Sequence, residues 1–379
     1  SAQQVQDPPA GDCGSNPAGG ALSGIRYLAD HDVGYFEVLG GDDPLESRNT
    51  RGGFPPFCRI LTDKNGIKSL TSIDGQTSIL LYGRHINSKW TVIIDKALER
   101  LRSGEVDKEV VKLGGLTWEL KRSNGGGYNY RCRLIGHGLE LQLATSPGYH
   151  GAGAEIPLAR VVYGWYICNT CDMRAVTARV IDYIEELGGR VDRYHIQRLD
   201  IQTTTTRDIL SGVADALKYD KIVTHCHKVQ TYTDGQRLES VTWRTSTGGW
   251  ALRIYDKVRE ILDTGAADKW QFYVDNLDST AFDRVEYQLS RDLLRNIGIT
   301  TFDDLYDKYV SLMLFCCHNC VRFIDRPRTH GHTSDAAIAD YWQHIIDVYT
   351  GTPYTDVQPL RRTARTPDGV RTPEAERTT

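Results

Sequence analysis

The chain contains no long apolar run. No stretch of its 379 residues approaches the roughly 18 apolar residues that a membrane-spanning helix needs, so we expect no membrane partner. The first residues, SAQQVQDPPAGDCGSNPAGG, have neither a basic start nor an apolar stretch, so no secretory signal is expected. Their Pro, Gly and Ser content instead predicts a disordered arm over residues 1–21.

A disulfide framework and an excess of positive charge are also missing. Nine cysteines cannot all pair with one another, which favours a reducing cytoplasm. The formal net charge is −4, so the whole chain lacks the basic signature of a nucleic-acid binder. A local signature is present, because residues 237–259 carry five basic and two acidic side chains. The composition, 40% hydrophobic and 25% charged, is typical of a soluble globular protein.

The pattern of expected elements divides the chain into five segments. Residues 22–150 alternate short strands with one helix over 89–102, which has apolar residues at helical spacing. Residues 151–325 are expected to form the catalytic core. A helical segment is expected over 326–357, and a disordered tail rich in Pro, Thr and Arg over 358–379.

The segment 151–325 alternates helices with strands joined by hairpins. Asp172 is expected to cap a helix that ends at Gly188-Gly189, and Thr206 to open another. This order predicts an α+β fold: an antiparallel sheet with helices packed on one face, preceded by a smaller α+β N-terminal region. The expected strands are YHIQRLDIQT, KIVTHCHKVQTYT, ESVTWRT, WALRIYDK and the strand that begins at FDRVEYQLS.

Three of these strands carry polar residues on one face. Side chains alternate along a strand, so each strand places its polar residues together. If the three faces converge, two carboxylates, several cations and one tyrosine share a cleft. The residues concerned are Arg198 and Asp200 on the first strand, Arg253, Tyr255 and Lys257 on the second, and Arg284, Glu286 and Gln288 on the third.

Such a cleft suits phosphodiester chemistry. Asp200 and Glu286 offer the hard oxygen ligands that Mg²⁺ or Mn²⁺ prefers, and such a metal neutralises charge as a phosphodiester reacts. A phenol with a pKa of about 10 is a poor nucleophile, and we expect Arg253 and Lys257 to lower the pKa of Tyr255. Attack would give a phosphotyrosine ester, which keeps the energy of the broken bond for rejoining.

The order of the blocks RLDIQ, WRTSTGGWALRIYDK and RVEYQLSRD resembles the replication initiation factor family. This family comprises the Rep_trans-type rolling-circle initiators of plasmids and filamentous phages and the related relaxases of conjugative elements. The resemblance covers residues 172–298. The matching positions are Arg198 and Asp200, the run Arg253, Ile254, Tyr255, Asp256 and Lys257, and then Arg284, Glu286 and Leu289.

The resemblance implies a site-specific DNA nickase and strand transferase. Tyr255 would attack one origin strand, stay linked to its 5′ phosphate and leave a free 3′-OH primer. The implied partners are origin DNA, double-stranded and locally melted to a single strand, a host helicase and a second copy of the chain. The implied catalytic residues are Tyr255, Arg253, Lys257 and Arg284, and the implied ligands of Mg²⁺ or Mn²⁺ are Asp200 and Glu286.

The chain departs from the family pattern at two positions. Thr204 stands where a second Asp is common, so a third metal ligand is not identified, and Arg244 stands where Gly is common. Two alternatives to a replication nickase therefore remain open. One is a conjugative relaxase with the same chemistry, and the other is a degenerate member that binds origin DNA without cutting it.

Five arginines are candidate DNA contacts: Arg198, Arg244, Arg322, Arg326 and Arg328. The last three form a basic run with His330 and His332, which fits a phosphate-contacting loop and a solvated linker equally well.

Two further groups have metal-ligand spacing. His225-Cys226-His227 fits a histidine pair on one strand face, or an ordinary polar strand. The other group consists of Cys168, Cys171, Cys316, Cys317 and Cys320, which fit a zinc site or buried core cysteines.

Overall fold

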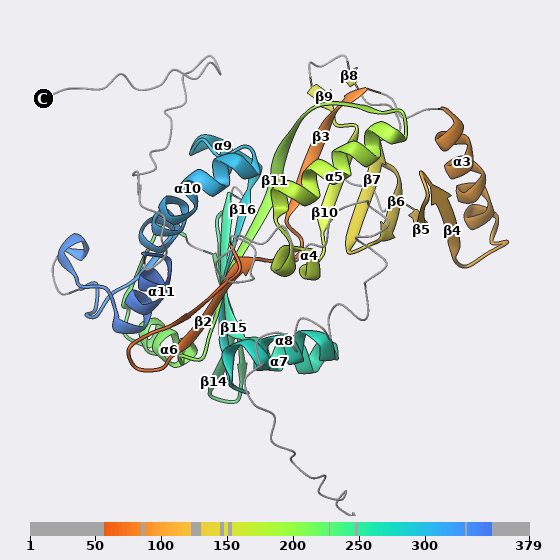
Figure 1. Ribbon diagram of the computed structural model, residues 1–379. Helices are drawn as coiled ribbons and strands as arrows, with labels where there is room; N and C mark the ends of the chain where they lie inside the picture. The colour runs from red at the N-terminus through yellow and green to blue at the C-terminus, as the bar shows by residue number, and fades with distance from the viewer. Residues whose placement is uncertain are drawn as a thin grey trace, which may run out of the picture.

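The computed structural model describes residues 57–84, 88–122, 130–144, 148–150, 154–226, 228–246, 249–329 and 332–350 (Figure 1). The predicted arm over 1–21 and tail over 358–379 lie outside these ranges. Within them, no helix combines the length and apolar character needed to cross a membrane.

One antiparallel sheet dominates the molecule, and the predicted α+β class is confirmed. Its path is β13-β14-β15-β16-β11-β3-β10-β7-β6-β5-β4, with β2 paired to β11 and β1 paired to β2. Its strands are β1 (Arg59–Thr62), β2 (Lys68–Ile73), β3 (Ser78–Arg84), β4 (Glu109–Leu113), β5 (Leu116–Arg122), β6 (Tyr130–Gly136), β7 (Leu139–Ala144), β10 (Ala159–Tyr163), β11 (Arg190–Thr205), β13 (Lys228–Asp234), β14 (Arg237–Arg244), β15 (Trp250–Asp256) and β16 (Asp283–Ser290). Two small sheets pair β8 (Gly148–His150) with β9 (Ala154–Ile156) and β12 (Ile222–Thr224) with β17 (Val321–Phe323).

The long strand β11 joins the two parts of this sheet. Its first half pairs with β3, and its second half lies between β2 and β16. Strands from before and after residue 150 are thus hydrogen-bonded in one sheet, which runs across the predicted domain boundary. The five-segment division remains a prediction.

Helices lie on both faces of the sheet near β11 and β16 (Figure 1), and not on one face as the sequence predicted. On the apolar face, Tyr287 donates to the sulfur of Cys317, and Thr203 is hydrogen-bonded to Tyr349 of α11. On the polar face, Tyr273 of α8 accepts a hydrogen bond from Arg284 of β16. The helices are α3 (Ser88–Ser103), α4 (Trp165–Thr170), α5 (Met173–Glu186), α6 (Leu210–Lys218), α7 (Lys257–Thr264), α8 (Ala267–Leu277), α9 (Arg291–Asn296), α10 (Phe302–Phe315) and α11 (Asp340–Thr350), with a π-helical turn η1 (Cys316–Cys320) after α10 and a 3₁₀ turn η2 (Thr333–Asp335) before α11.

Several predicted elements are confirmed. The helix expected over 89–102 is α3, and Asp172 caps α5 by accepting a hydrogen bond from the Arg174 amide. The prediction that Thr206 opens a helix is wrong. Helix α6 begins at Leu210, because Asp208 accepts from the Ser211 amide and Asp283 from the Leu210 amide.

The strand expected over WALRIYDK ends one residue earlier than predicted. Asp256 accepts a hydrogen bond of 3.0 Å from the Arg259 amide and so caps α7. Lys257 is therefore the first residue of a helix, and the prediction that it shares a strand face with Arg253 and Tyr255 is wrong.

Candidate active site

The strand register brings the predicted polar residues onto one face. Arg253 lies directly opposite Glu286, and Tyr255 directly opposite Arg284. Asp200 pairs with Gln288 while Glu286 pairs with Gln202. Asp200 and Glu286 are thus diagonal neighbours, whose Cα atoms ordinary sheet geometry places roughly 7–8 Å apart. The expected convergence of the three strands is present in the structure.

Tyr255 and Glu286 are joined directly. The Tyr255 hydroxyl donates a hydrogen bond of 2.8 Å to Oε2 of Glu286, and Oε1 of Glu286 accepts one of 3.3 Å from Nη1 of Arg253. The Arg253 guanidinium carbon also lies 4.9 Å from the centroid of the Tyr255 ring. Tyr255 is only 6% exposed, whereas the Arg253 side chain is 45% exposed. Arg253 therefore lies between the phenol and solvent.

The phenol does not have the lowered pKa that its cationic neighbours led us to expect. Burial raises the pKa of Tyr255 well above its ordinary value, and the charge of Glu286 raises it further. Arg284 and Arg253 act in the opposite direction but are outweighed. The expectation that flanking cations activate the phenol is wrong for this arrangement. A carboxylate already hydrogen-bonded to the hydroxyl provides a different route, since it can accept the phenol proton.

Arg284 is the buried centre of a second network. Its Nε donates to Oγ1 of Thr204 at 3.0 Å, its Nη1 to Oδ2 of Asp74 at 2.8 Å, and its Nη2 to the hydroxyl of Tyr273. The residue is only 1% exposed. Arg284 therefore holds the sheet beside Tyr255 in place and does not face solvent. Thr204, at the position of the family's second Asp, bonds to Arg284.

Asp74 is a site residue that sequence reasoning missed. It lies just after β2, its side chain accepts from Arg284, and its charge raises the pKa of Asp200 and of Tyr255. The sequence contains no motif around it. Only the pairing of β2 with β11 brings this position to the site.

Lys257 remains beside Tyr255 although it belongs to α7. Its ammonium nitrogen lies 5.8 Å from the centroid of the Tyr255 ring and pairs with Glu260. The side chain is buried. Burial, followed by the charge of Arg284, lowers the pKa of Lys257 to about 8.

Asp200 is buried and fully engaged by Arg198. Nε and Nη2 of Arg198 donate to its two oxygens at 2.8 and 2.6 Å. Burial raises the pKa of Asp200 to about 7 despite this partner, and Glu286 and Asp74 contribute. The face thus concentrates three carboxylates, a distribution that a bound cation would stabilise.

The donor set fits a hard divalent cation in part. Two diagonal carboxylates, with water and phosphate, suffice for Mg²⁺. In the described part of the chain, no group of three or more His, Cys, Asp or Glu side chains is arranged to hold a metal. A cation at this face would therefore have two protein ligands, Asp200 and Glu286. Their oxygens contact Arg198, Arg253 and Tyr255. A metal would therefore have to replace the guanidinium groups, which are the more exposed partners of both ion pairs.

The other predicted DNA contacts separate into two groups. Arg244 is exposed and lies opposite Ala251 of β15. Ala251 precedes Arg253 by two positions on the same strand, so Arg244 lies on the face that carries Tyr255. Arg322 belongs to the separate sheet β12–β17 and donates to the carbonyl of Thr333. Arg326 donates to the carbonyl of His332, and Arg328 pairs with Asp220. Arg322 and Arg326 thus contact carbonyls of their own loop, and Arg328 contacts Asp220 after α6. All three have partners within the protein, which favours the linker interpretation.

The alternative metal groups do not form sites in the described residues. His225 lies in a bend between β12 and β13, and His227 falls outside the described residues. Cys168, Cys171, Cys316, Cys317 and Cys320 are buried free thiols, and burial raises the pKa of Cys171 and of Cys317 to about 12. This favours the interpretation of these cysteines as core residues.

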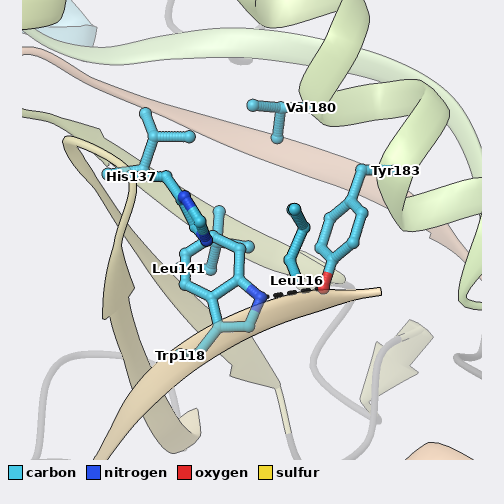
Figure 2. Close-up of a pocket in the computed structure, with 7 residues that line it drawn as sticks. Leu116, Trp118, His137, Leu141, Val180 and Tyr183 are labelled. Carbon is cyan, nitrogen blue, oxygen red and sulfur yellow. Dashed lines mark hydrogen bonds between the residues drawn. The ribbon is translucent and has the colours of Figure 1, made fainter. Parts of the chain in front are cut away.

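A small cavity lies far along the sheet from Tyr255, between α5 and strands β5 to β7 (Figure 2). Its lining is mostly apolar, and the nearby Trp118 indole donates to the Tyr183 hydroxyl at 2.9 Å. About 10 Å³ is open to the centre of a water molecule, which is room for roughly one water. The cavity is therefore a packing void without space for a substrate.

Comparison with solved structures gives a distant likeness. The chain resembles the rolling circle replication initiator protein from Geobacillus stearothermophilus, at 14% identity and a TM-score of 0.44, over 76% of this chain and 99% of that chain. No family model and no curated protein matches the sequence.

Proposed function

We propose that this protein is a rolling-circle replication initiator, a nickase that cuts one strand of its origin with Tyr255. The observation that carries the proposal is the hydrogen bond of 2.8 Å from the Tyr255 phenol to Glu286, on the same sheet face as Asp200 and Arg253. A hydroxyl nucleophile, an adjacent carboxylate and a nearby exposed cation are the groups that phosphodiester transfer requires. The order of the three sequence blocks supports the same assignment.

The phenol oxygen attacks the scissile phosphorus, and its proton passes to Oε2 of Glu286. The bond between phosphorus and the 3′ oxygen breaks, and the 3′ oxygen takes a proton from solvent to become the free primer hydroxyl. The strand stays joined to Tyr255 through its 5′ phosphate. Because the carboxylate accepts the proton during attack, a raised phenol pKa does not prevent the reaction.

Arg253 has to move for this reaction to begin. Its guanidinium covers the ring of Tyr255 and bonds to Glu286, yet it is the exposed member of the cluster. A DNA phosphate competes with Glu286 for this guanidinium, since both are anions that arginine binds well. Transfer of Arg253 to the phosphate uncovers the phenol and binds the substrate at the same time.

Asp200 and Glu286 would hold Mg²⁺ or Mn²⁺ once substrate has drawn away their guanidinium partners. Bound there, the metal would neutralise developing charge on the phosphate. Lys257 and Arg284 act at longer range: Arg284 fixes the strand opposite Tyr255, and Lys257 adds positive potential beside the ring.

The direct test is incubation with supercoiled DNA that carries the origin of its own genetic element. We expect open-circular product and protein attached to a 5′ end. A replication initiator and a conjugative relaxase share this chemistry, so a transfer-origin substrate tested in parallel separates them. Addition of a host helicase and measurement of oligomeric state test the proposed partners.

A second candidate function is origin binding without cleavage. It is favoured by the burial of Tyr255 and the raised pKa of its phenol. Tight binding of origin DNA without any open-circular product, with Mg²⁺ or Mn²⁺ present, would select this candidate.

A further inference from the structure

The edge strand β13 presents an exposed surface beside Tyr255. All seven residues of β13 are exposed, and among the described residues its only partner in the sheet is β14. Tyr232 lies opposite Ser240, which lies opposite Tyr255. Lys228, Gln230 and Tyr232 therefore project from the same face as the proposed nucleophile.

Two cations on this face stand directly opposite each other. Lys228 pairs with Arg244 across the ladder, an arrangement that destabilises a sheet through like-charge repulsion. Both side chains are exposed, and neither has an acidic partner within 4.0 Å among the residues that the structure describes. An anion bound between them would remove the repulsion.

The acidic residues of the hairpin do not offset this pair. Asp234 and Glu239 lie toward the turn, where their charges act on Arg259. Asp256 is paired with Arg237. The end of the hairpin that carries Lys228 and Arg244 is therefore cationic.

Tyr232 adds an aromatic surface to these cations. It is 56% exposed, and Gln230 donates a hydrogen bond to its hydroxyl, which restrains the ring. Sheet spacing places it roughly 10 Å from Tyr255 and its Cα roughly 13 Å from that of Lys228. Cations interleaved with an exposed aromatic ring form the usual surface for single-stranded nucleic acid, since bases stack on the ring while phosphates meet the cations.

We propose that β13 and β14 form a platform for single-stranded DNA, with Lys228 and Arg244 binding phosphate and Tyr232 stacking on a base. The platform leads the strand to Tyr255. It rests on the proposed function and deepens it by naming the residues outside the catalytic cluster that would hold the melted strand. Bases in a duplex are already stacked on one another, so the Tyr232 ring can serve only an unpaired base.

The test is fluorescence anisotropy on the full chain with an oligothymidylate about 16 nucleotides long, near the upper site size for such surfaces. Tyr232→Ala should weaken binding about 10-fold to 100-fold, while Tyr232→Trp should retain it. Lys228→Glu with Arg244→Glu should weaken binding and lower the salt slope by about 1.4 for the two lost phosphate contacts. Affinity of Tyr232→Ala for origin duplex should stay unchanged.

Matched controls come from exposed residues away from this face. Tyr219→Ala removes a tyrosine that is 47% exposed at the end of α6, and Lys112→Glu reverses a charge on β4. Both should bind the oligonucleotide like wild type. Wild-type affinity in Tyr232→Ala, or an equal loss in Tyr219→Ala, would overturn the platform.

Failure of the platform can be told apart from failure of the proposed nickase. If wild type nicks its origin while Tyr232→Ala and the double charge reversal bind the oligonucleotide normally, only the platform is wrong. If the platform variants lose oligonucleotide binding but wild type forms no covalent adduct, the platform stands and the nickase is wrong.

Discussion

The Tyr255 hydroxyl donates a hydrogen bond of 2.8 Å to Glu286, which lies on the neighbouring strand β16. From sequence, Glu286 is expected only as a metal ligand. The contact suggests a second role, because it places the carboxylate where it can accept the phenol proton. It also makes the two residues interdependent. Burial and then the carboxylate charge raise the phenol pKa, and in the proposed reaction the same carboxylate is the base for attack.

Glu286→Gln should separate proton acceptance from structure. The amide can still accept the phenol hydrogen bond, but it is neither a base nor a charged metal ligand, so the single-turnover nicking rate should fall about 10²–10⁴-fold. Origin affinity should change little. The rate is measured on pre-melted origin DNA, with Glu119→Gln on the distant strand β5 as control. A wild-type rate in Glu286→Gln would show that this carboxylate does not take the proton.

Arg284, opposite Tyr255, and Arg253, opposite Glu286, should differ sharply in their contribution to the free energy of unfolding. Arg284→Met leaves the buried Asp74 without its partner and should lower the free energy of unfolding by about 3–5 kcal/mol. Arg253→Met removes a guanidinium that is 45% exposed and leaves Glu286 its hydrogen bond from Tyr255, so the loss should be smaller, about 1–2 kcal/mol. Urea denaturation of both variants measures the difference. Equal losses would mean that Arg284 is not the structural centre of the site.

Lys257 should leave a signature in the dependence of stability on pH. Its folded-state pKa is lowered to about 8 from the ordinary lysine value of 10.5. Between these values the unfolded chain binds a proton that the folded chain does not, so this residue makes stability rise with pH, by up to about 1.4 kcal/mol per pH unit. Lys257→Met should remove that contribution between about pH 8 and 9.5.

The measurement for Lys257 is a series of urea titrations across this pH window. Lys112→Met, a change at an exposed lysine on β4, is the control and should keep the wild-type slope. If Lys257→Met also keeps the wild-type slope, the ammonium is not held in the desolvated position beside Tyr255.

Metal binding should require both acidic residues of the site. Isothermal titration with Mn²⁺, in the presence of a single-stranded origin oligonucleotide, should show one site in wild type. Asp200→Asn should weaken that site by about 10-fold or more. Changes to residues that only support a metal ligand already cost about 10-fold in metal affinity. Asp292→Asn, a change at an acidic residue of α9 paired with Arg295, should bind like wild type. Undiminished binding in Asp200→Asn would exclude the pair as ligands.

Much of this arrangement follows from strand alternation, which is a local property. The polar faces of β11, β15 and β16 are visible in the sequence, and the register places them together as expected. Local signals also compete. Asp256 is a good helix cap, but the alternating pattern before it predicts a strand that is one residue too long and that includes Lys257.

The rest depends on contacts between distant parts of the chain. Asp74 reaches Arg284 across 210 positions, and no local pattern around it predicts this pairing. The burial of Tyr255, and therefore the direction of its pKa shift, depends on neighbours that include Arg253, Glu286 and Lys257 of α7. Strand periodicity states which face a side chain occupies, but not what covers that face.

The central claim is tested most directly by the covalent adduct on Tyr255. Wild type and Tyr255→Phe are incubated with supercoiled origin DNA and Mg²⁺ or Mn²⁺, and protein-linked DNA is resolved on a denaturing gel. The variant keeps the ring and its neighbours and loses only the attacking oxygen. We predict open-circular product and an adduct with wild type, and neither with Tyr255→Phe, at unchanged origin affinity. An adduct formed by Tyr255→Phe would contradict the account and direct attention to Tyr232 and Tyr273, the tyrosines on the same side of the sheet.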